Sequence, residues 1–186
     1  MPERHGLLLV GHGTRDAHGL EEFHQTVTQV SRLWKWGPVE GGFLELASPT
    51  VSDGIDRLAS RGVRRLRVVP LLLFAAGHAK RDIPQTVETA VARYPEIVVS
   101  QASILGCHPS IVALSRQRYR EAVAARDPVP ERQTVLLLVG RGSHDQEATS
   151  EMVRFARLRT QGEKFAKVAV SFLAMAEPSF SETISR

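Results

Sequence analysis

Cysteine, long apolar runs and aromatic residues are all scarce in this sequence. A single cysteine, Cys107, excludes an internal disulfide and any metal site made only of cysteines within one chain, so we expect a cytoplasmic location. The N-terminus lacks an apolar segment of signal-peptide length, and no apolar run approaches the length of a membrane span. We therefore expect a soluble protein without membrane partners.

Clustered positive charge is missing as well, although the chain is basic overall. The 24 Lys and Arg residues exceed the 20 Asp and Glu residues, which gives a net charge of +4, and the isoelectric point is about 9.7. A nucleic-acid groove would need a basic stripe with interleaved aromatic residues, and the sequence shows neither. We expect an anionic small molecule as partner, and no nucleic acid.

The apolar residues that are present predict an α/β fold. At 186 residues with 42% hydrophobic content, the chain is long enough for one complete domain and part of another. Short apolar runs alternate with segments whose apolar residues recur every three or four positions, which is typical of strands alternating with amphipathic helices. We predict strands over residues 7–10, 42–46, 66–74 and 97–99, and helices over residues 20–33, 49–59, 85–94 and 109–126. Short connections between these elements indicate a parallel four-stranded sheet with helices on both faces.

The sequence also contains an internal repeat. Residues 136–143 repeat the pattern of residues 7–14, which lie 129 positions earlier (136 minus 7), and residues 172–178 repeat that of residues 43–49 at the same distance. Two separate blocks at one offset argue for a duplicated unit rather than coincidence. We therefore expect a second, incomplete copy of the same fold.

The repeat sets the predicted domain division. We expect a first domain over residues 1–126, a linker over residues 127–133 and a partial copy of the domain over residues 134–186. The counterpart of residue 78 would fall at position 207 (78 plus 129), so we expect a truncated chain, because an exposed half-sheet would leave unpaired edges. A half-domain completed by packing of the two repeats, or by a homo-oligomer, is the alternative.

Three unusual residues stand at the ends of the first three predicted strands. His12 follows the first strand between two glycines, Glu45 lies inside the apolar run of the second, and His78 follows the third. An unpaired carboxylate buried there would cost on the order of several kcal/mol, so Glu45 needs a partner or an opening to solvent. Because the carboxyl ends of parallel strands share one edge of a sheet, we expect the three side chains to meet. Two imidazoles and one carboxylate suit a divalent first-row metal and leave coordination positions open.

These residues also have a plain structural interpretation. His12 alone would cap a turn after a strand, and three unrelated, locally satisfied residues are the alternative to a shared site. The second copy has Arg141 in place of His12 and Ala174 in place of Glu45, so it cannot offer the same ligands. The duplicated strand and turn therefore do not require the histidine.

Three blocks of sequence resemble the signature blocks of the sirohydrochlorin chelatases, which are class II tetrapyrrole chelatases. The blocks are Gly-His-Gly-Thr-Arg at residues 11–15, Phe-Leu-Glu-Leu-Ala-Ser-Pro-Thr at 43–50 and Val-Pro-Leu-Leu-Leu-Phe-Ala-Ala-Gly-His-Ala-Lys-Arg-Asp-Ile-Pro at 69–84. Thr14 departs from the usual Ser but keeps the hydroxyl. Leu-Gly-Cys-His-Pro at residues 105–109 also resembles the family, and we interpret its His108 as part of a turn and helix start.

The resemblance implies an enzyme that inserts a divalent metal into sirohydrochlorin, cobalt for cobalamin or ferrous iron for siroheme. It implies that His12, Glu45 and His78 bind the incoming ion, which is then a substrate and not a tightly bound cofactor. Co²⁺, Fe²⁺ and Ni²⁺ all accept imidazole and carboxylate ligands. The ring must lose two pyrrole protons as the metal enters. We expect His12 to be the likelier proton acceptor, while Glu45 supplies negative charge or takes a proton.

Three basic residues lie beside the two histidines in the sequence. Arg15, Lys80 and Arg81 are expected to bind the carboxylates of the tetrapyrrole, with solvated surface charge as the alternative for each. Asp82 is expected to cap the helix that starts near Pro84 and not to bind metal.

Two other functions remain open on the sequence alone. A non-catalytic protein that binds or delivers a divalent metal would use the same three ligands, and it would leave the absorption spectrum of added tetrapyrrole unchanged. A phosphate cradle at residues 11–14 is the other function. It is disfavoured because the G-x-G-x-x-G spacing and the P-loop lysine are both missing.

Overall fold

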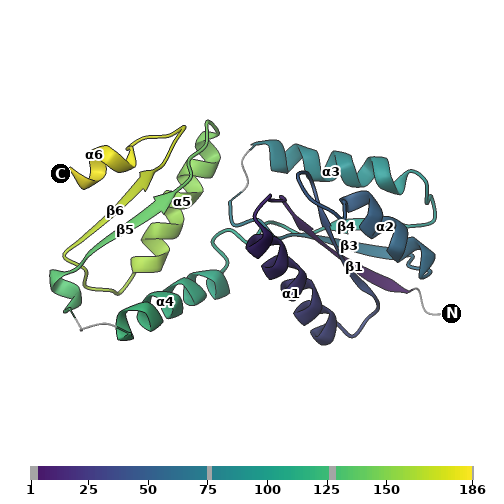
Figure 1. The fold of residues 1–186 in the computed structure, drawn as a ribbon, viewed down its shortest axis with the longest axis horizontal. Coiled ribbons are helices and arrows are strands. Elements are labelled where there is room, and N and C mark those ends of the chain that lie inside the picture. The colour runs from purple at the N-terminus through teal and green to yellow at the C-terminus, as the bar shows by residue number, and fades with distance from the viewer. Residues whose placement is uncertain (1–3, 75–76, 126–128, 186) are drawn as a thin grey trace. The chain divides into compact units, whose positions relative to one another are not determined.

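The computed structural model describes residues 4–74, 77–125 and 129–185, with the side chains of residues 77–80 outside that description. The chain divides into two compact units (Figure 1). Unit 1 comprises Met1–Leu72 and His78–Ile104, and unit 2 comprises Leu73–Gly77 and Leu105–Arg186. Within the described ranges, no helix is both long and apolar enough to cross a membrane.

Unit 1 is a parallel four-stranded sheet with helices on both faces, as predicted. Its elements in chain order are β1 (His5–Gly11), α1 (Ala17–Leu33), β2 (Val39–Phe43), α2 (Val51–Ser60), β3 (Arg65–Pro70), α3 (Gly77–Val91) and β4 (Val98–Gln101). The strand order is β2-β1-β3-β4, and each neighbouring pair is parallel. The carboxyl ends of all four strands therefore lie at one edge of the sheet, where ligands bind in open α/β folds.

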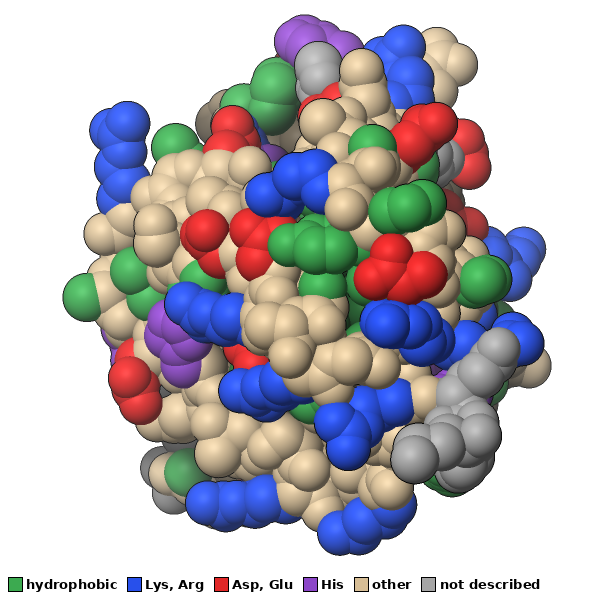
Figure 2. Space-filling model, turned by 90° about the vertical axis from the view of Figure 1, so that its right-hand side faces the viewer, with side chains coloured by type: hydrophobic (Ala, Val, Ile, Leu, Met, Phe, Trp, Pro, Cys, Tyr) green, Lys and Arg blue, Asp and Glu red, His purple; other side chains and the backbone are tan. Residues whose placement is uncertain are grey.

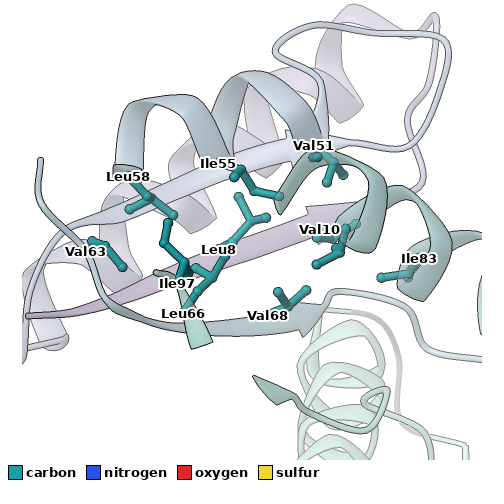
Figure 3. Close-up of a cluster of buried hydrophobic side chains, with 12 residues drawn as sticks. Leu8, Val10, Val51, Ile55, Leu58, Val63, Leu66, Val68, Ile83 and Ile97 are labelled. Carbon is teal, nitrogen blue, oxygen red and sulfur yellow. The ribbon is translucent and has the colours of Figure 1, made fainter. Parts of the chain in front are cut away.

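Strand β1 is buried on both faces, which its run of four apolar residues predicts. Leu8 and Val10 are fully buried on the face that α2 and α3 cover, together with Ile55 and Ile83 (Figure 3). Leu7 and its same-face neighbours pack on the opposite side, which α1 covers (Figure 1). The two cores follow from the strand's period of two, which sends successive side chains to opposite faces.

The face on the α1 side is covered less completely. Leu33 is 77% exposed. It is the last residue of α1, and Trp34, one position further on, packs against this core instead. Beside them, a groove lined by Leu7, Val69 and Val98, among others, opens on the same face of the sheet.

Unit 2 repeats the first strand pair of unit 1. Its elements are α4 (Pro109–Ala124), the 3₁₀ turn η1 (Glu131–Gln133), β5 (Val135–Gly140), α5 (Gln146–Thr160), β6 (Lys167–Phe172) and α6 (Phe180–Ile184). Strands β5 and β6 are parallel and pair Leu136 with Val168, just as β1 and β2 pair Leu7 with Val39. The duplicated unit predicted from the sequence is thus confirmed as a second copy of the strand–helix–strand arrangement.

Helix α4 packs within unit 2. The Arg116 guanidinium donates hydrogen bonds to the carbonyl oxygens of Leu158 and Arg159, at 2.7 and 2.8 Å, at the end of α5. Tyr119 meets Phe165 edge-on, with ring centroids 5.5 Å apart. The predicted division followed the repeat and placed residues 109–126 in the first domain, whereas these contacts group α4 with the second sheet.

The ends of three predicted elements, α4, β3 and α3, agree with the structure only in part. His108 is the N-cap of α4 and accepts a hydrogen bond from Ser110 N at 3.2 Å, which confirms the predicted helix start. The third strand was predicted to reach residue 74 but ends at Pro70, which lacks an N–H. One further backbone hydrogen bond to β1 follows it, from Leu71 N to Val10 O at 2.8 Å. The helix predicted from residue 85 begins instead at Gly77 and includes Pro84. Because Asp82 lies inside that helix, the prediction that it caps the helix is wrong.

On the face shown in Figure 2, Asp and Glu side chains lie mainly in the upper half of the view, and Lys and Arg side chains outnumber them in the lower half.

Candidate metal site

His12 and Glu45 face each other at the carboxyl edge of the unit 1 sheet. His12 lies in the loop after β1, and Glu45 lies in the loop after β2. His12 Nε2 and Glu45 Oε1 are 3.5 Å apart, and the two side chains are 50% and 57% exposed. The structure therefore brings together two of the three predicted ligands, in a position that solvent can reach.

Glu45 is not the buried strand residue that its apolar neighbours predicted. Strand β2 ends at Phe43, so Glu45 stands two positions beyond the sheet, in the loop. The prediction of a strand over residues 42–46 is wrong in its bounds, because β2 spans Val39–Phe43 and ends before Leu44. The sequence required a partner or an opening to solvent for this carboxylate. Glu45 has both, because it is exposed and the imidazole of His12 lies beside it.

Backbone hydrogen bonds carry the β1–β2 pairing into the two loops. Leu44 N donates to Gly11 O at 3.0 Å, and Glu45 N donates to His12 O at 3.1 Å. The main chains of His12 and Glu45 are thus tied directly to each other. The side chains start from a fixed pair of backbone positions, so little backbone freedom remains to be lost when an ion binds.

Gly13 allows this close approach of the two loops. It adopts φ +105°, in the left-handed region that favours glycine. A Cβ at this position would overlap the carbonyl oxygen of Glu45. The glycine after His12 is therefore required by the position of the Glu45 main chain.

The loop that carries Glu45 is held at both ends. Leu46 has φ 64°, an uncommon conformation for a leucine, and Ala47 N donates to Glu45 O at 2.8 Å. At the far end, Thr50 and Asp53 form a capping box at the start of α2. The hydrogen bond from the Thr50 backbone holds the pKa of Asp53 below its usual value, and the Thr50 side-chain hydrogen bond adds to this effect.

The capping box has a signal in the sequence, although it was not among the predicted features. Thr50-Val51-Ser52-Asp53 has the spacing of a capping box immediately before an apolar-periodic segment. Leu46 has no comparable signal, because nothing in its residue type indicates a positive φ. The residues that hold the site are therefore only partly readable from the sequence.

His78 and Lys80 have side chains that fall outside the described residues. Their main chain lies in the first turn of α3, which begins at Gly77. Across the described part of the chain, no three His, Cys, Asp or Glu side chains come together to hold a metal ion. The participation of His78 therefore stays a prediction, as do the substrate contacts of Lys80.

The other two predicted substrate contacts are exposed arginines. Arg15 follows the His12 loop, and Arg81 lies in α3. Next to Arg15, the Thr14 hydroxyl accepts a hydrogen bond from Asp16 N at 3.1 Å, and Asp16 caps α1 through Gly19 N at 2.8 Å. Thr14 and Asp16 thus start the helix, and the exposed Arg15 lies between them.

This arrangement suits reversible binding of a divalent cation. A neutral imidazole and a carboxylate are ligands for first-row ions, and an exposed pair leaves most of the coordination sphere free. Neither ligand is a thiolate, which would hold a late transition metal more firmly. The site has the chemistry expected where an ion must arrive and leave.

Comparison with known proteins identifies the class first. The solved structure of SirB from Bacillus subtilis with Fe³⁺ superposes with a TM-score of 0.89 at 28% identity, covering 98% of this chain and 70% of that one. The fold is thus that of a chelatase-like α/β protein. The family model described as CbiX matches residues 6–122 and 135–186. The chain belongs to the CbiX family of sirohydrochlorin chelatases.

Curated relatives agree with this assignment. A sirohydrochlorin ferrochelatase from Priestia megaterium is 34% identical over 179 residues, which are 95% of this chain and 65% of that protein. A sirohydrochlorin cobaltochelatase from Sulfurisphaera tokodaii is 31% identical over 121 residues, covering 64% of this chain and 94% of that protein. The chain therefore spans less than two thirds of the longer relative, whereas nearly the whole of the shorter relative matches 64% of this chain.

Proposed function

We propose that this protein inserts Co²⁺ or Fe²⁺ into sirohydrochlorin, with the ion held by His12, Glu45 and His78. The observation that carries the proposal is the His12–Glu45 pair, 3.5 Å apart and open to solvent at the carboxyl edge of the sheet. Relatives named as cobaltochelatases and ferrochelatases support the choice of reaction. His78, at the start of α3, is the proposed third ligand.

Each ligand has a separate task in metal insertion. The Glu45 carboxylate lowers the energy of the bare cation by its negative charge. His12 binds the ion through a neutral nitrogen and, once the ion moves to the ring, takes a pyrrole proton with the same nitrogen. The two protons that leave the macrocycle thus pass to His12 and Glu45, the two groups that the departing metal has just freed.

The basic residues around the pair bind the substrate in this proposal. Sirohydrochlorin carries carboxylate side chains around its rim, and Arg15 and Arg81 are exposed and able to donate bidentate hydrogen bonds to them. Lys80 contributes a third positive charge from the first turn of α3. Their binding energy orients the ring over the ion before insertion.

The test replaces the carboxylate without changing its shape. Glu45→Gln in the full chain is expected to weaken Co²⁺ binding by more than the roughly 10–100-fold that loss of an outer-shell partner costs, because a direct ligand is lost. Metal insertion followed by the absorption spectrum of sirohydrochlorin should fall with it. Glu88→Gln, an exposed carboxylate on α3, is the matched control and should leave both measurements unchanged.

Two outcomes would count against the proposal in different ways. Normal insertion by Glu45→Gln would remove Glu45 from the site. Tight Co²⁺ binding by the unaltered protein without any spectral change of added sirohydrochlorin would favour a metal-delivery protein over a chelatase.

A further inference from the structure

We propose that unit 2 carries a carboxylate-binding site centred on Arg141, at the place that corresponds to the His12–Glu45 pair of unit 1. The choice of sirohydrochlorin as one source of the carboxylate rests on the proposed function. The site itself rests on the geometry of the duplicated loops.

Unit 2 keeps the backbone hydrogen bonds and the positive φ angles that surround the His12–Glu45 pair in unit 1. Leu173 N donates to Gly140 O and Ala174 N donates to Arg141 O, both at 2.9 Å, as their counterparts do in unit 1. Gly142 has φ 91°, and a Cβ there would overlap the carbonyl oxygen of Ala174. Met175 has φ 60°, close to the 64° of its counterpart Leu46. Arg141 and Ala174 thus occupy the backbone positions that hold His12 and Glu45 in unit 1.

The side chains at these two positions have changed in a complementary way. A guanidinium at position 141 is always charged and repels cations, so it cannot replace His12 as a metal ligand. Alanine at position 174 removes the carboxylate that would otherwise pair with that charge. The second copy therefore has a permanent cation in place of the imidazole and lacks the carboxylate beside it.

The neighbouring polar groups already have partners of their own. The Glu177 carboxylate accepts from Ser179 N at 2.7 Å, the Ser143 hydroxyl accepts from Asp145 N at 3.0 Å, and the Asp145 carboxylate accepts from Glu147 N at 2.9 Å. Arg141 is exposed and makes no side-chain hydrogen bond or ion pair to any residue in the described ranges. Its donors are free for an external group.

A carboxylate fits this position best. The planar guanidinium donates two parallel hydrogen bonds to the two oxygens of a carboxylate, and the methyl group of Ala174 leaves space where Glu45 places its carboxylate in the first copy. Two sources offer this group: a side-chain carboxylate of sirohydrochlorin, or a small free carboxylate. The experiment separates them.

The test uses three full-length variants. Arg141→Gln removes the charge, and Ala174→Glu supplies the internal counter-ion that unit 1 has at this position. Ala174→Gln adds the same bulk without charge and is the matched control. Binding of metal-free sirohydrochlorin is measured by absorbance titration and binding of citrate by calorimetry, with circular dichroism and the Co²⁺ affinity of each variant as checks on folding.

We expect Arg141→Gln and Ala174→Glu to weaken binding about tenfold, as the loss of a charge-assisted hydrogen bond implies, while Ala174→Gln binds as the unaltered protein does. A loss confined to sirohydrochlorin identifies the substrate as the source, and a loss of citrate binding identifies a free carboxylate. Equal affinities in all variants, or no binding of either probe by the unaltered protein, would overturn the proposal.

These outcomes are independent of the chelatase assignment. A protein that binds metal-free sirohydrochlorin through Arg141 but inserts no metal would refute the proposed function and keep this site. A protein that inserts metal with equal rates and affinities in every variant would keep the function and refute the site.

Discussion

Gly13 is the residue on which the geometry of the His12–Glu45 pair depends most directly. Gly13 and Gly62 both have positive φ, 105° and 75°. A Cβ at Gly13 would overlap the carbonyl oxygen of Glu45, whereas a Cβ at Gly62 would have nothing within 4 Å. The two positions therefore separate the cost of an unfavourable backbone conformation from the cost of moving the Glu45 main chain.

Gly62→Ala is expected to lower the free energy of unfolding by about 1–2 kcal/mol, the cost of a left-handed conformation, and to leave Co²⁺ affinity unchanged. Gly13→Ala is expected to lower it by more than about 2 kcal/mol and to abolish Co²⁺ binding, because the hydrogen bond from Glu45 N to His12 O cannot survive the overlap. Urea unfolding and calorimetric titration with Co²⁺ measure the two effects. Retention of Co²⁺ affinity by Gly13→Ala would show that the paired main chains do not hold the site.

At the scale of single elements, the start of α2 sets the far end of the Glu45 loop. The folded protein holds the pKa of Asp53 below the ordinary value of 3.8, mainly through the backbone hydrogen bond from Thr50. The ionised carboxylate is thus favoured in the folded state, and its stabilising contribution is fully present above pH 3.8. That contribution is lost as the pH falls through the lowered pKa of the folded state.

Asp53→Asn is therefore expected to be less stable than the unaltered protein at neutral pH, by an amount that shrinks below pH 3.8. Urea unfolding between pH 2.5 and 6 measures it. Tryptophan fluorescence reports on unit 1 alone, because both tryptophans, Trp34 and Trp36, belong to that unit. Glu88→Gln serves as the control and should show no such pH-dependent difference. A difference for Asp53→Asn that stays constant over this pH range would contradict the assigned role of the carboxylate.

The elements and their order could be predicted because burial leaves a strong pattern in the sequence. The four apolar residues that start at Leu7 are buried in a central strand, and the constant offset of the repeat revealed the second strand pair. The loops were less predictable. Glu45 lies in an apolar run that continues from β2, but the strand ends before it. Hydrophobic pattern records which residues avoid water and does not record where a backbone turns, as the positive φ of Leu46 illustrates.

At the scale of the whole molecule, the duplication makes unit 2 an internal control for metal binding. Both units tie their loops with the same backbone hydrogen bonds, donated by Leu44 and Glu45 in one and by Leu173 and Ala174 in the other. The imidazole and carboxylate pair exists in unit 1 alone, because unit 2 has Arg141 and Ala174 in its place. An ion held between the two loops of unit 1 should oppose their separation there and have no such effect in unit 2.

Hydrogen–deuterium exchange with and without Co²⁺ tests this difference within one molecule. At a Co²⁺ concentration about 100 times the Kd, binding adds about 2.7 kcal/mol to the free energy of any opening that releases the ion. Exchange over residues 44–45 should therefore slow by about 100-fold, while exchange over residues 173–174 should not change. Equal slowing in both units would indicate non-specific binding, and no slowing in either would remove His12 and Glu45 as metal ligands. Because the two segments have equivalent backbone hydrogen bonds, a difference in their exchange rates isolates the contribution of the His12 and Glu45 side chains.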